Sequence, residues 1–377
     1  MKQNMRKRYG NLLEKIVKPL LAWYDKGRRI LPWRESPTPY HVWVSEIMLQ
    51  QTRVEAVKPY YDRFMKELPD IEALAKVDEE NLLKLWEGLG YYNRARNLKK
   101  SAEKIVIDYE GQMPDSYEEL VKLTGIGSYT AGAIASIAFG KPYPAVDGNV
   151  LRILARLRLD ERDILEIKVK RVVEAELLQV IPKDRPGDFN QALMELGAVV
   201  CIPNGMPKCD IFPLSAFCEA VKTERVMEFP KKKAKKKRSI EEKTILVIQN
   251  DDKIVLRKRK ETGLLAGMYE FPSMDGTQTA KGVLAYINAI GMTPLKIEKL
   301  PPAKHIFTHK EWHMTGFLVR IDELERLEPK EGLFFATQLE MADRYPLPSA
   351  FAAYMKFVGT KGQSGQTETG NGGKSRG

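Results

Sequence analysis

The sequence is poor in cysteine and lacks a long apolar run. All three cysteines lie between residues 201 and 218, which is not the disulfide framework of a secreted protein. No apolar stretch approaches the roughly 20 residues that a membrane-spanning helix needs. The basic start of the chain, residues 1–8, is not followed by the apolar segment of a signal peptide. These absences predict an intracellular, cytoplasmic protein with no membrane partner.

The chain has an excess of positive charge. Its 377 residues carry 61 Lys and Arg against 50 Asp and Glu, a formal net charge of +11. This balance suits a polyanionic partner such as nucleic acid, although many soluble proteins are basic for no specific reason. An apolar fraction of 43% over this length is ample for two or three domains with buried cores.

Apolar residues recur at helical spacing through the first part of the chain, with short Gly and Pro breaks between the runs. This pattern predicts a mostly α-helical domain over residues 1–225. The run of basic residues at 231–238 cannot pack against itself, so residues 226–240 are expected to form a solvated linker.

The pattern changes after the linker. Two strand-like runs, residues 244–248 and 254–259, flank a polar turn and predict a β-hairpin. Residues 241–358 are therefore expected to form a small α+β domain. Residues 359–377 are rich in Gly, Ser, Thr, Gln and Lys without an apolar period, which predicts a disordered tail.

Gly125 and Gly127 lie between two predicted helices. They allow the backbone to turn tightly and to point amide N–H groups at one spot, and the helix that follows adds the positive end of its dipole. The spacing alone is more typical of a plain turn. Because Asp147 lies about twenty residues further on, we interpret residues 115–139 as a helix-hairpin-helix that binds a DNA phosphate.

Two carboxyl groups carry the predicted chemistry. Glu46 lies among apolar residues of a predicted helix, where a carboxyl tends to keep its proton and can donate it to a purine ring nitrogen. Asp147 precedes another helix, whose amides can hold a carboxylate ionised beside the positive sugar that forms as an N-glycosidic bond breaks. The purely structural alternatives are a surface Glu46 paired with Arg53 and a helix N-cap at Asp147.

Residues 31–53, 88–98 and 120–157 resemble the MutY family of adenine DNA glycosylases, within the helix-hairpin-helix superfamily, and the likeness covers roughly residues 10–350. It implies two helical lobes followed by a Nudix-like domain. It also implies a monomeric, nucleoid-associated enzyme of base excision repair. Such an enzyme removes adenine mispaired with 8-oxoguanine or guanine in double-stranded DNA.

The resemblance assigns catalytic roles. Glu46 falls on the general acid that protonates adenine at N7. Asp147 falls on the carboxylate that stabilises, or transiently bonds to, the sugar cation. Tyr129 falls on the tyrosine that supports these carboxyls, and Asn149 falls on the active-site asparagine.

The resemblance also assigns binding roles. Arg34 and Gln191 fall on the adenine pocket, whereas Gln51 and Tyr91 fall on residues that enter the duplex around the lesion, and Leu49 is counted with them. An amide such as that of Gln51 can fill the gap that a flipped-out base leaves.

Tyr129 separates this chain from the bifunctional lyases of the superfamily, which place a lysine at that position. Such a lysine attacks C1′ and forms the Schiff base that leads to strand cleavage, and a phenol cannot do this. We therefore expect a monofunctional enzyme that leaves an abasic site. Lys122 and Lys141 lie nearby in the sequence, so slow lyase activity stays open. A lyase acting on oxidised pyrimidines and a non-catalytic damage-binding protein are the alternative functions.

Cys201, Cys209 and Cys218 fall where the family binds a [4Fe–4S] cluster through the order Cys-x6-Cys-x2-Cys-x5-Cys. Here seven residues separate the first two, and Phe212 occupies the third position. Four thiolates normally hold a cubane cluster. Three are compatible with a cluster that has an open iron, with a three-iron cluster or with none, and the sequence leaves these alternatives open.

Residues 263–272 resemble the Nudix-like domain of the family. A working Nudix hydrolase needs a helix with clustered glutamates for Mg²⁺, and the helix expected at residues 281–286 has none. This favours lesion recognition over pyrophosphate hydrolysis. Phe307, Thr308 and His309 match the family's Phe-Ser-His loop that senses 8-oxoguanine, and their hydroxyl and imidazole can hydrogen-bond a damaged purine.

Overall fold

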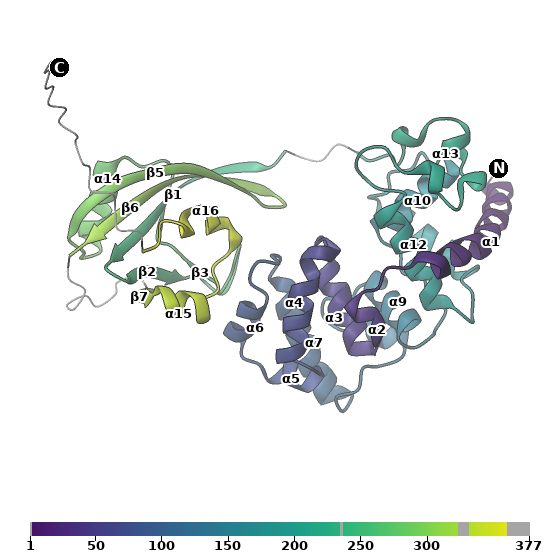
Figure 1. Ribbon diagram of the computed structural model, residues 1–377, viewed down its shortest axis with the longest axis horizontal. Coiled ribbons are helices and arrows are strands. Elements are labelled where there is room, and N and C mark those ends of the chain that lie inside the picture. Colours follow the sequence, from purple (N-terminus) through teal and green to yellow (C-terminus); the bar gives the residue numbers. More distant parts are fainter. Residues whose placement is uncertain (1, 234–236, 323–331, 360–377) are drawn as a thin grey trace, which may run out of the picture. The chain divides into compact units, whose positions relative to one another are not determined.

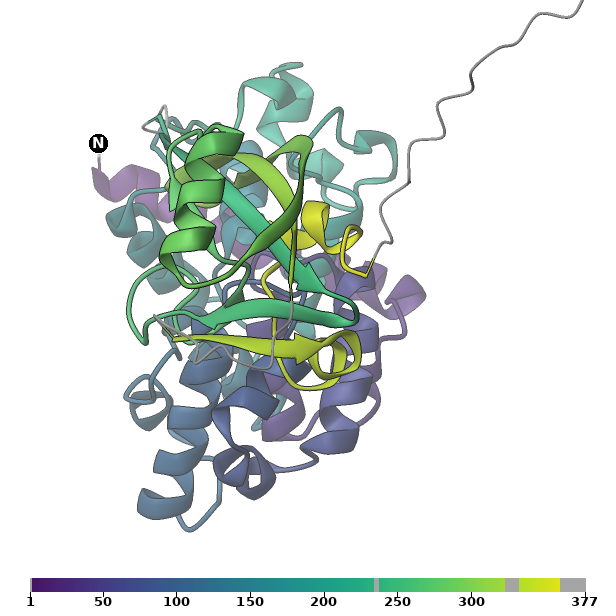
Figure 2. The same cartoon turned by 90° about the vertical axis from the view of Figure 1, so that its left-hand side faces the viewer.

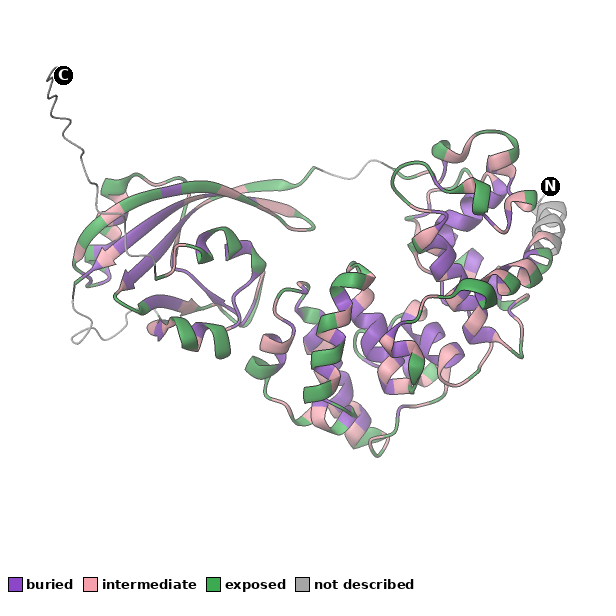
Figure 3. Cartoon of the chain, viewed as in Figure 1, coloured by how far each residue is buried: buried purple, intermediate pink, exposed green. Residues whose placement is uncertain are grey.

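The structure is a computed structural model that describes residues 2–233, 237–322 and 332–359, with the backbone alone for residues 2–11. The chain divides into two compact units, residues 1–236 and 237–377. In each unit the buried residues line the inner faces of the helices or strands (Figure 3). The tail predicted to be disordered lies outside the described residues from position 360 onward.

The N-terminal unit consists of helices. In chain order they are α1 (Lys2–Gly27), α2 (Pro32–Glu35), α3 (Pro39–Leu49), α4 (Val54–Glu67), α5 (Ile71–Lys76), α6 (Glu79–Leu85), α7 (Asn93–Asp108), α8 (Tyr117–Leu120), α9 (Ser128–Ile137), α10 (Gly148–Arg158), α11 (Ile167–Leu178), α12 (Pro186–Val199), η1 (Cys209–Ile211), η2 (Ser215–Phe217), α13 (Glu219–Lys222) and η3 (Val226–Glu228). None of the helices in the described part of the chain is both long and apolar enough to span a membrane.

These helices form the two lobes that the sequence predicts (Figure 1). In one lobe α3 packs on α4 and α7, and α5 packs on α7. In the other, α12 packs on α1 and α10, and its apolar core extends to the cysteine loop. α9 contacts both α3 and α12, so it joins the lobes and brings residues of both to one place.

Polar side chains set several helix starts. Thr38 caps α3, Asp70 caps α5 and Asp78 caps α6, each by accepting a hydrogen bond from a backbone N–H of the first turn. The predicted hairpin consists of α8, which is a single turn, and α9.

Part of the segment predicted as a basic linker, residues 226–240, contacts the helical unit. η3 occupies its start, and the N–H of Ile164 donates to the carbonyl of Lys231 at 3.2 Å. Lys233 pairs with Glu166 at 2.8 Å. Carboxylates near the start of α11 thus fix part of the basic run to the helical unit, which charge repulsion within the run alone did not predict.

The C-terminal unit is the predicted α+β domain. Its elements are β1 (Ser239–Asn250), β2 (Lys253–Lys258), β3 (Tyr269–Glu270), β4 (Ser273–Asp275), α14 (Ala280–Ala289), β5 (Pro294–Ile306), β6 (Lys310–Ile321), β7 (Leu333–Thr337), α15 (Gln338–Asp343), η5 (Ser349–Phe351) and α16 (Ala352–Met355). The strand order is β3-β2-β1-β6-β5, with β4 also paired to β1 and β7 to β2. β1 and β6 are parallel, while β1–β2 and β5–β6 are antiparallel.

Both faces of this sheet are covered, because alternate residues of a strand point to opposite sides. Ile245 and Val247 of β1 face a core that includes Phe351. Leu246 and Ile248 face the other core, which α14 covers (Figure 2). A strand with both faces buried explains why residues 245–248 are apolar without a polar alternation.

Candidate active site

Glu46 lies in the buried helix α3 and is only 6% exposed. Tyr129, in the first turn of α9, donates its hydroxyl proton to Oε2 of Glu46 at 2.5 Å. Burial raises the pKa of Glu46 to about 7. The negative charge of Asp147 adds to this rise, while the Tyr129 hydrogen bond and the positive charge of Arg34 oppose it. A substantial fraction of the carboxyl therefore carries a proton near neutral pH.

Asp147 is the N-cap of α10. Its Oδ1 accepts the backbone N–H groups of Asn149 and Val150, both at 2.9 Å, and its Oδ2 accepts Nδ2 of Asn149 at 2.7 Å. Burial raises its pKa, and these three hydrogen bonds and the charge of Arg152 oppose the rise. Both oxygens of Asp147 therefore accept hydrogen bonds, as the two oxygens of an ionised carboxylate do. The structural role as a cap and a chemical role are compatible in this geometry.

Arg152 is a site residue that sequence reasoning missed. Its Nη2 donates to Oδ1 of Asn149 and to the carbonyl of Gly197, each at 2.8 Å. Because Asn149 accepts from Arg152, its amide N–H₂ must point at Asp147. The only signal in the sequence is the spacing of three residues between Asn149 and Arg152, which places both on one face of α10.

Two glycines allow the backbone to close around this cluster. A Cβ atom at Gly132 of α9 would lie 2.2 Å from the carbonyl oxygen of Pro144, in the segment that leads to Asp147. A Cβ atom at Gly197 of α12 would lie 2.5 Å from Cβ of Asn149. α9 and α12 therefore approach Asp147 and Asn149 only because these two positions lack side chains.

A cavity of about 490 Å³ has Arg34 and Gln191 in its lining, which brings together the two residues predicted for the adenine pocket. Glu195 of α12 holds Arg34 in place, because its buried carboxylate accepts Nη1 of Arg34 at 2.5 Å. The same carboxylate accepts Nε of Arg29 at 3.2 Å. Glu195 was not predicted from sequence, since its partners lie more than 160 positions away in the chain.

Gly125 and Gly127 of the hairpin differ in whether another residue would fit at their positions. Gly125 has a φ of +80°, and a Cβ there would lie 2.7 Å from Cβ of Asn97, so both conformation and space demand glycine. Gly127 is the N-cap of α9, and its α-carbon faces open space. The start of α9 is the positive end of a helix dipole, a place that favours an anion.

Gln51 and Tyr91, predicted to enter the duplex, lie at the tips of two loops of the same lobe. Both side chains are exposed, and Tyr91 is 48% accessible. Leu49, the last residue of α3, is half-buried.

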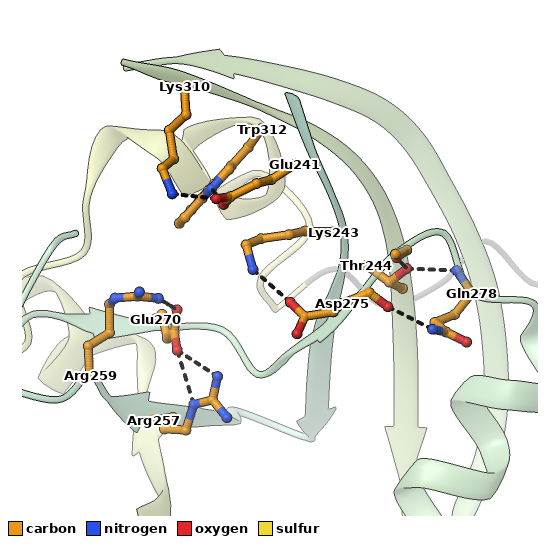
Figure 4. Close-up of polar contacts among 11 residues, drawn as sticks. Glu241, Lys243, Thr244, Arg257, Arg259, Glu270, Asp275, Gln278, Lys310 and Trp312 are labelled. Atoms are coloured by element: carbon orange, nitrogen blue, oxygen red, sulfur yellow. Dashed lines mark hydrogen bonds and ion pairs between the residues drawn. The ribbon is translucent and has the colours of Figure 1, made fainter. Parts of the chain in front are cut away.

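In the C-terminal unit, Phe307, Thr308 and His309 form the turn between β5 and β6. The Phe307 ring packs edge-on against Trp312 with centroids 4.9 Å apart, and Trp312 donates Nε1 to Glu241 at 2.9 Å (Figure 4). Phe307 is therefore fixed to the sheet, whereas Thr308 and His309 are exposed.

The acidic residues on this part of the sheet pair with cations (Figure 4). Glu241 pairs with Lys310, and the buried Glu270 pairs with both Arg257 and Arg259. In the described part of the chain, no three His, Cys, Asp or Glu side chains are grouped in a way that could hold a metal ion.

The cysteine loop does not fit a [4Fe–4S] cluster. Cys201, Cys209 and Cys218 line one cavity of about 10 Å³, which is room for about one water molecule. Phe212, 6% exposed, also lines this cavity and belongs to the core of the lobe. Nη1 of Arg156 lies 3.3 Å from Sγ of Cys201. The buried Phe212 ring occupies a ligand position, and the space beside the three thiols is too small for a cubane cluster.

Replacing Phe212 with alanine is expected to destabilise the helical unit by about 3–5 kcal/mol, because it leaves a cavity in the core. Urea unfolding followed by circular dichroism measures this, with Ile211→Ala, at an exposed position beside it, as the control. Iron analysis of anaerobically purified protein tests the accompanying expectation of no cluster. Stoichiometric iron, or a loss below about 1 kcal/mol, would contradict this account of the loop.

The helical unit has the fold of helix-hairpin-helix DNA glycosylases. Residues 44–183 match the HhH-GPD superfamily of base excision DNA repair proteins, and residues 244–357 match the NUDIX domain. A thermostable thymine-DNA glycosylase of known structure superposes with a TM-score of 0.52 at 28% identity, covering 56% of this chain and 98% of that one.

Similarity to individual proteins narrows the DNA glycosylases to one family. The chain is 35% identical over 309 residues to the adenine DNA glycosylase of Buchnera aphidicola subsp. Baizongia pistaciae, covering 81% of this chain and 86% of that one. It is 38% identical over 354 residues to the adenine DNA glycosylase of Arabidopsis thaliana, covering 79% of this chain but 56% of that longer one. The chain belongs to the adenine DNA glycosylase family.

Proposed function

We propose that this protein hydrolyses the N-glycosidic bond of adenine mispaired with 8-oxoguanine or guanine in duplex DNA, as a monofunctional enzyme of base excision repair. The observation that carries the proposal is the buried Glu46, which accepts a hydrogen bond from Tyr129 and is influenced by the charge of Asp147, the N-cap of α10. The names of its relatives support adenine as the base removed.

The reaction begins with an adenine flipped out of the stack, which costs least at a mispair. Glu46 donates its proton to N7, so the base leaves as a neutral purine and the glycosidic electron pair goes with it. Asp147 stabilises the positive charge that develops at C1′ and O4′. Water then adds to C1′ and loses a proton, and Glu46, now a carboxylate, can accept that proton.

The neighbouring elements position the DNA. The start of α9, the positive end of that helix, suits a phosphate near the lesion. Arg34 and Gln191 offer donors and an acceptor for the edge of the extruded base. The 490 Å³ cavity that they line includes neither Glu46 nor Asp147 in its lining.

The side chains near the carboxyls support base removal without strand cleavage. Tyr129 is a phenol whose pKa burial raises well above its usual value, and it offers no amine. Lys122 pairs with Glu119 at 2.5 Å and Lys141 with Asp115 at 2.8 Å, so both nearby amines are bound in ion pairs.

Single-turnover assays on duplexes of one sequence, with adenine opposite 8-oxoguanine, guanine or thymine, test the function. Adenine release is expected opposite the first two, with strand breaks only after alkali. Nicking without alkali together with borohydride trapping would favour the lyase alternative. Tight binding without release of any base would favour a damage-binding protein.

We expect the rate of adenine excision to fall above about pH 7, because Glu46 must be protonated and its pKa is about 7. Above this pKa the protonated fraction drops about tenfold per pH unit. The rate should also fall in acid as Asp147 takes up a proton. Single-turnover rates across the pH range measure both limbs, and a rate still rising above pH 8 would contradict the role of Glu46 as acid.

The turn at Phe307–His309 is proposed to read 8-oxoguanine. Replacing His309 with alanine is expected to reduce the preference for 8-oxoguanine over guanine by about tenfold, the value of one hydrogen bond. The ratio of single-turnover rates on the two duplexes measures it. His313→Ala, whose ring lies 3.3 Å from Glu311, is the control, and an unchanged ratio for His309→Ala would argue against the reader.

A further inference from the structure

Gln51 and Tyr91 share an unusual backbone conformation. Their φ angles are 59° and 50°, in the left-handed region. For a residue with a side chain this region costs about 1–2 kcal/mol, and it persists only where the surroundings fix it. Interactions with buried residues must therefore fix the conformations of the two loops that expose Gln51 and Tyr91.

Arg94 holds both loops. It lies in the first turn of α7 and is buried. Its Nη1 donates to the carbonyls that precede Gln51, and its Nη2 donates to the carbonyls that precede Tyr91. The acceptors are Ile47 at 2.8 Å, Met48 at 2.9 Å, Gln50 at 2.7 Å, Leu89 at 3.1 Å and Gly90 at 3.1 Å, with the Thr52 hydroxyl at 3.4 Å.

The guanidinium also contacts aromatic rings. Its centre lies 5.5 Å from the Tyr91 ring and 5.4 Å from the Trp86 ring. Trp86 in turn donates Nε1 to the carbonyl of Gly90 at 3.1 Å. Burial lowers the pKa of Arg94 to about 10, so the cation and its hydrogen bonds persist at neutral pH.

We propose that Arg94 is a positioning residue that presents Gln51 and Tyr91 as one paired wedge for the DNA duplex. The inference rests on the proposed glycosylase function. Planar side chains inserted into a duplex fill the space of a flipped base and hold the neighbouring bases apart, and two such side chains work together only at a fixed separation. Because Ile47 and Met48 belong to α3, Arg94 also ties the wedge to the helix that carries Glu46.

Lysine cannot replace this arrangement, since a single ammonium lacks the planar fork that serves two loops at once. We expect Arg94→Lys to excise adenine about 100-fold more slowly, the size of effect that a small misplacement produces. It should also lose the fluorescence increase of 2-aminopurine placed at the adenine position, which reports base flipping. Arg96→Lys, on the same helix and paired with Glu79 at 2.7 Å, is the control and should retain both.

A double-mutant cycle separates positioning from stability. In a protein with Gln51→Ala and Tyr91→Ala, the further change Arg94→Lys is expected to have little effect on flipping, because the wedge is already absent. Three results would each overturn the proposal. The losses of base flipping could be additive, Arg94→Lys could flip the base as well as the wild type does, or Arg94→Lys could fail to fold. Failure of the wild-type protein to release adenine would instead refute the function on which it rests.

Discussion

Glu46→Gln is expected to reduce single-turnover adenine excision by about 10²–10⁴-fold, the usual contribution of a general acid. Glutamine matches the size of the carboxyl and can still accept the hydroxyl proton of Tyr129, but it has no acidic proton for the base. Because burial raises the pKa of Glu46 to about 7, a substantial fraction of the carboxyl is already uncharged at neutral pH, and the substitution removes little charge below this pH. We therefore expect folding and DNA binding to change little while chemistry is lost.

The matched control is Glu55→Gln in α4. Glu55 is exposed and pairs with Lys58 at 2.9 Å, an interaction that contributes little to stability, so this variant should excise adenine at the wild-type rate. Excision by Glu46→Gln within a few-fold of wild type would remove Glu46 from the role of acid. A variant that also loses its affinity for mispaired DNA would instead point to a binding role.

The settings of the two carboxyls could be predicted from sequence because both depend on local neighbours. The apolar residues around Glu46 in α3 indicate burial, and the position of Asp147 before α10 indicates a cap. The family resemblance placed Tyr129 beside the carboxyls, but the local residue patterns did not, because Tyr129 lies 83 positions from Glu46, whose carboxyl it contacts. That contact depends on the packing of α3 against α9, a tertiary feature without a local pattern.

Arg94, Arg152 and Glu195 show most clearly which site residues cannot be predicted from sequence. Arg94 and Arg152 bind backbone carbonyls, and every residue carries a carbonyl, so no residue type marks the partner in advance. Glu195 is a buried acid in a helix and is not distinguished by sequence from a surface glutamate. Its role becomes visible only when Arg29 and Arg34 are seen to converge on it.

The role of Phe212 could be predicted from sequence only in part. The sequence shows that a ligand position is occupied by an aromatic residue, but not whether the loop leaves room for iron. In the structure Phe212 lines a cavity of about 10 Å³ together with Cys201, Cys209 and Cys218, which is room for about one water molecule. Packing of this kind depends on the whole lobe and follows from no motif.

Asp147→Asn is expected to slow adenine excision by about 10²–10³-fold, because the positive sugar loses the fixed negative charge that stabilises it. Asparagine is as good an N-cap as aspartate, so Oδ1 can still accept the N–H groups of Asn149 and Val150. The new amide would face Nδ2 of Asn149, which donates to Asp147 at 2.7 Å. Losing that hydrogen bond should cost about 1 kcal/mol of stability, far less than the effect on the rate.

Asp78→Asn provides the control, since Asp78 caps α6 by accepting the N–H of Asn81 at 2.9 Å. It should leave excision unchanged, and urea unfolding of both variants separates capping from chemistry. The pH profile adds an independent test. The charge of Asp147 raises the pKa of Glu46, so its removal should move the alkaline limb of the residual activity to lower pH. A slowed variant whose alkaline limb stays in place would mean that the two carboxyls do not act on one another, and the site would have to be assigned differently.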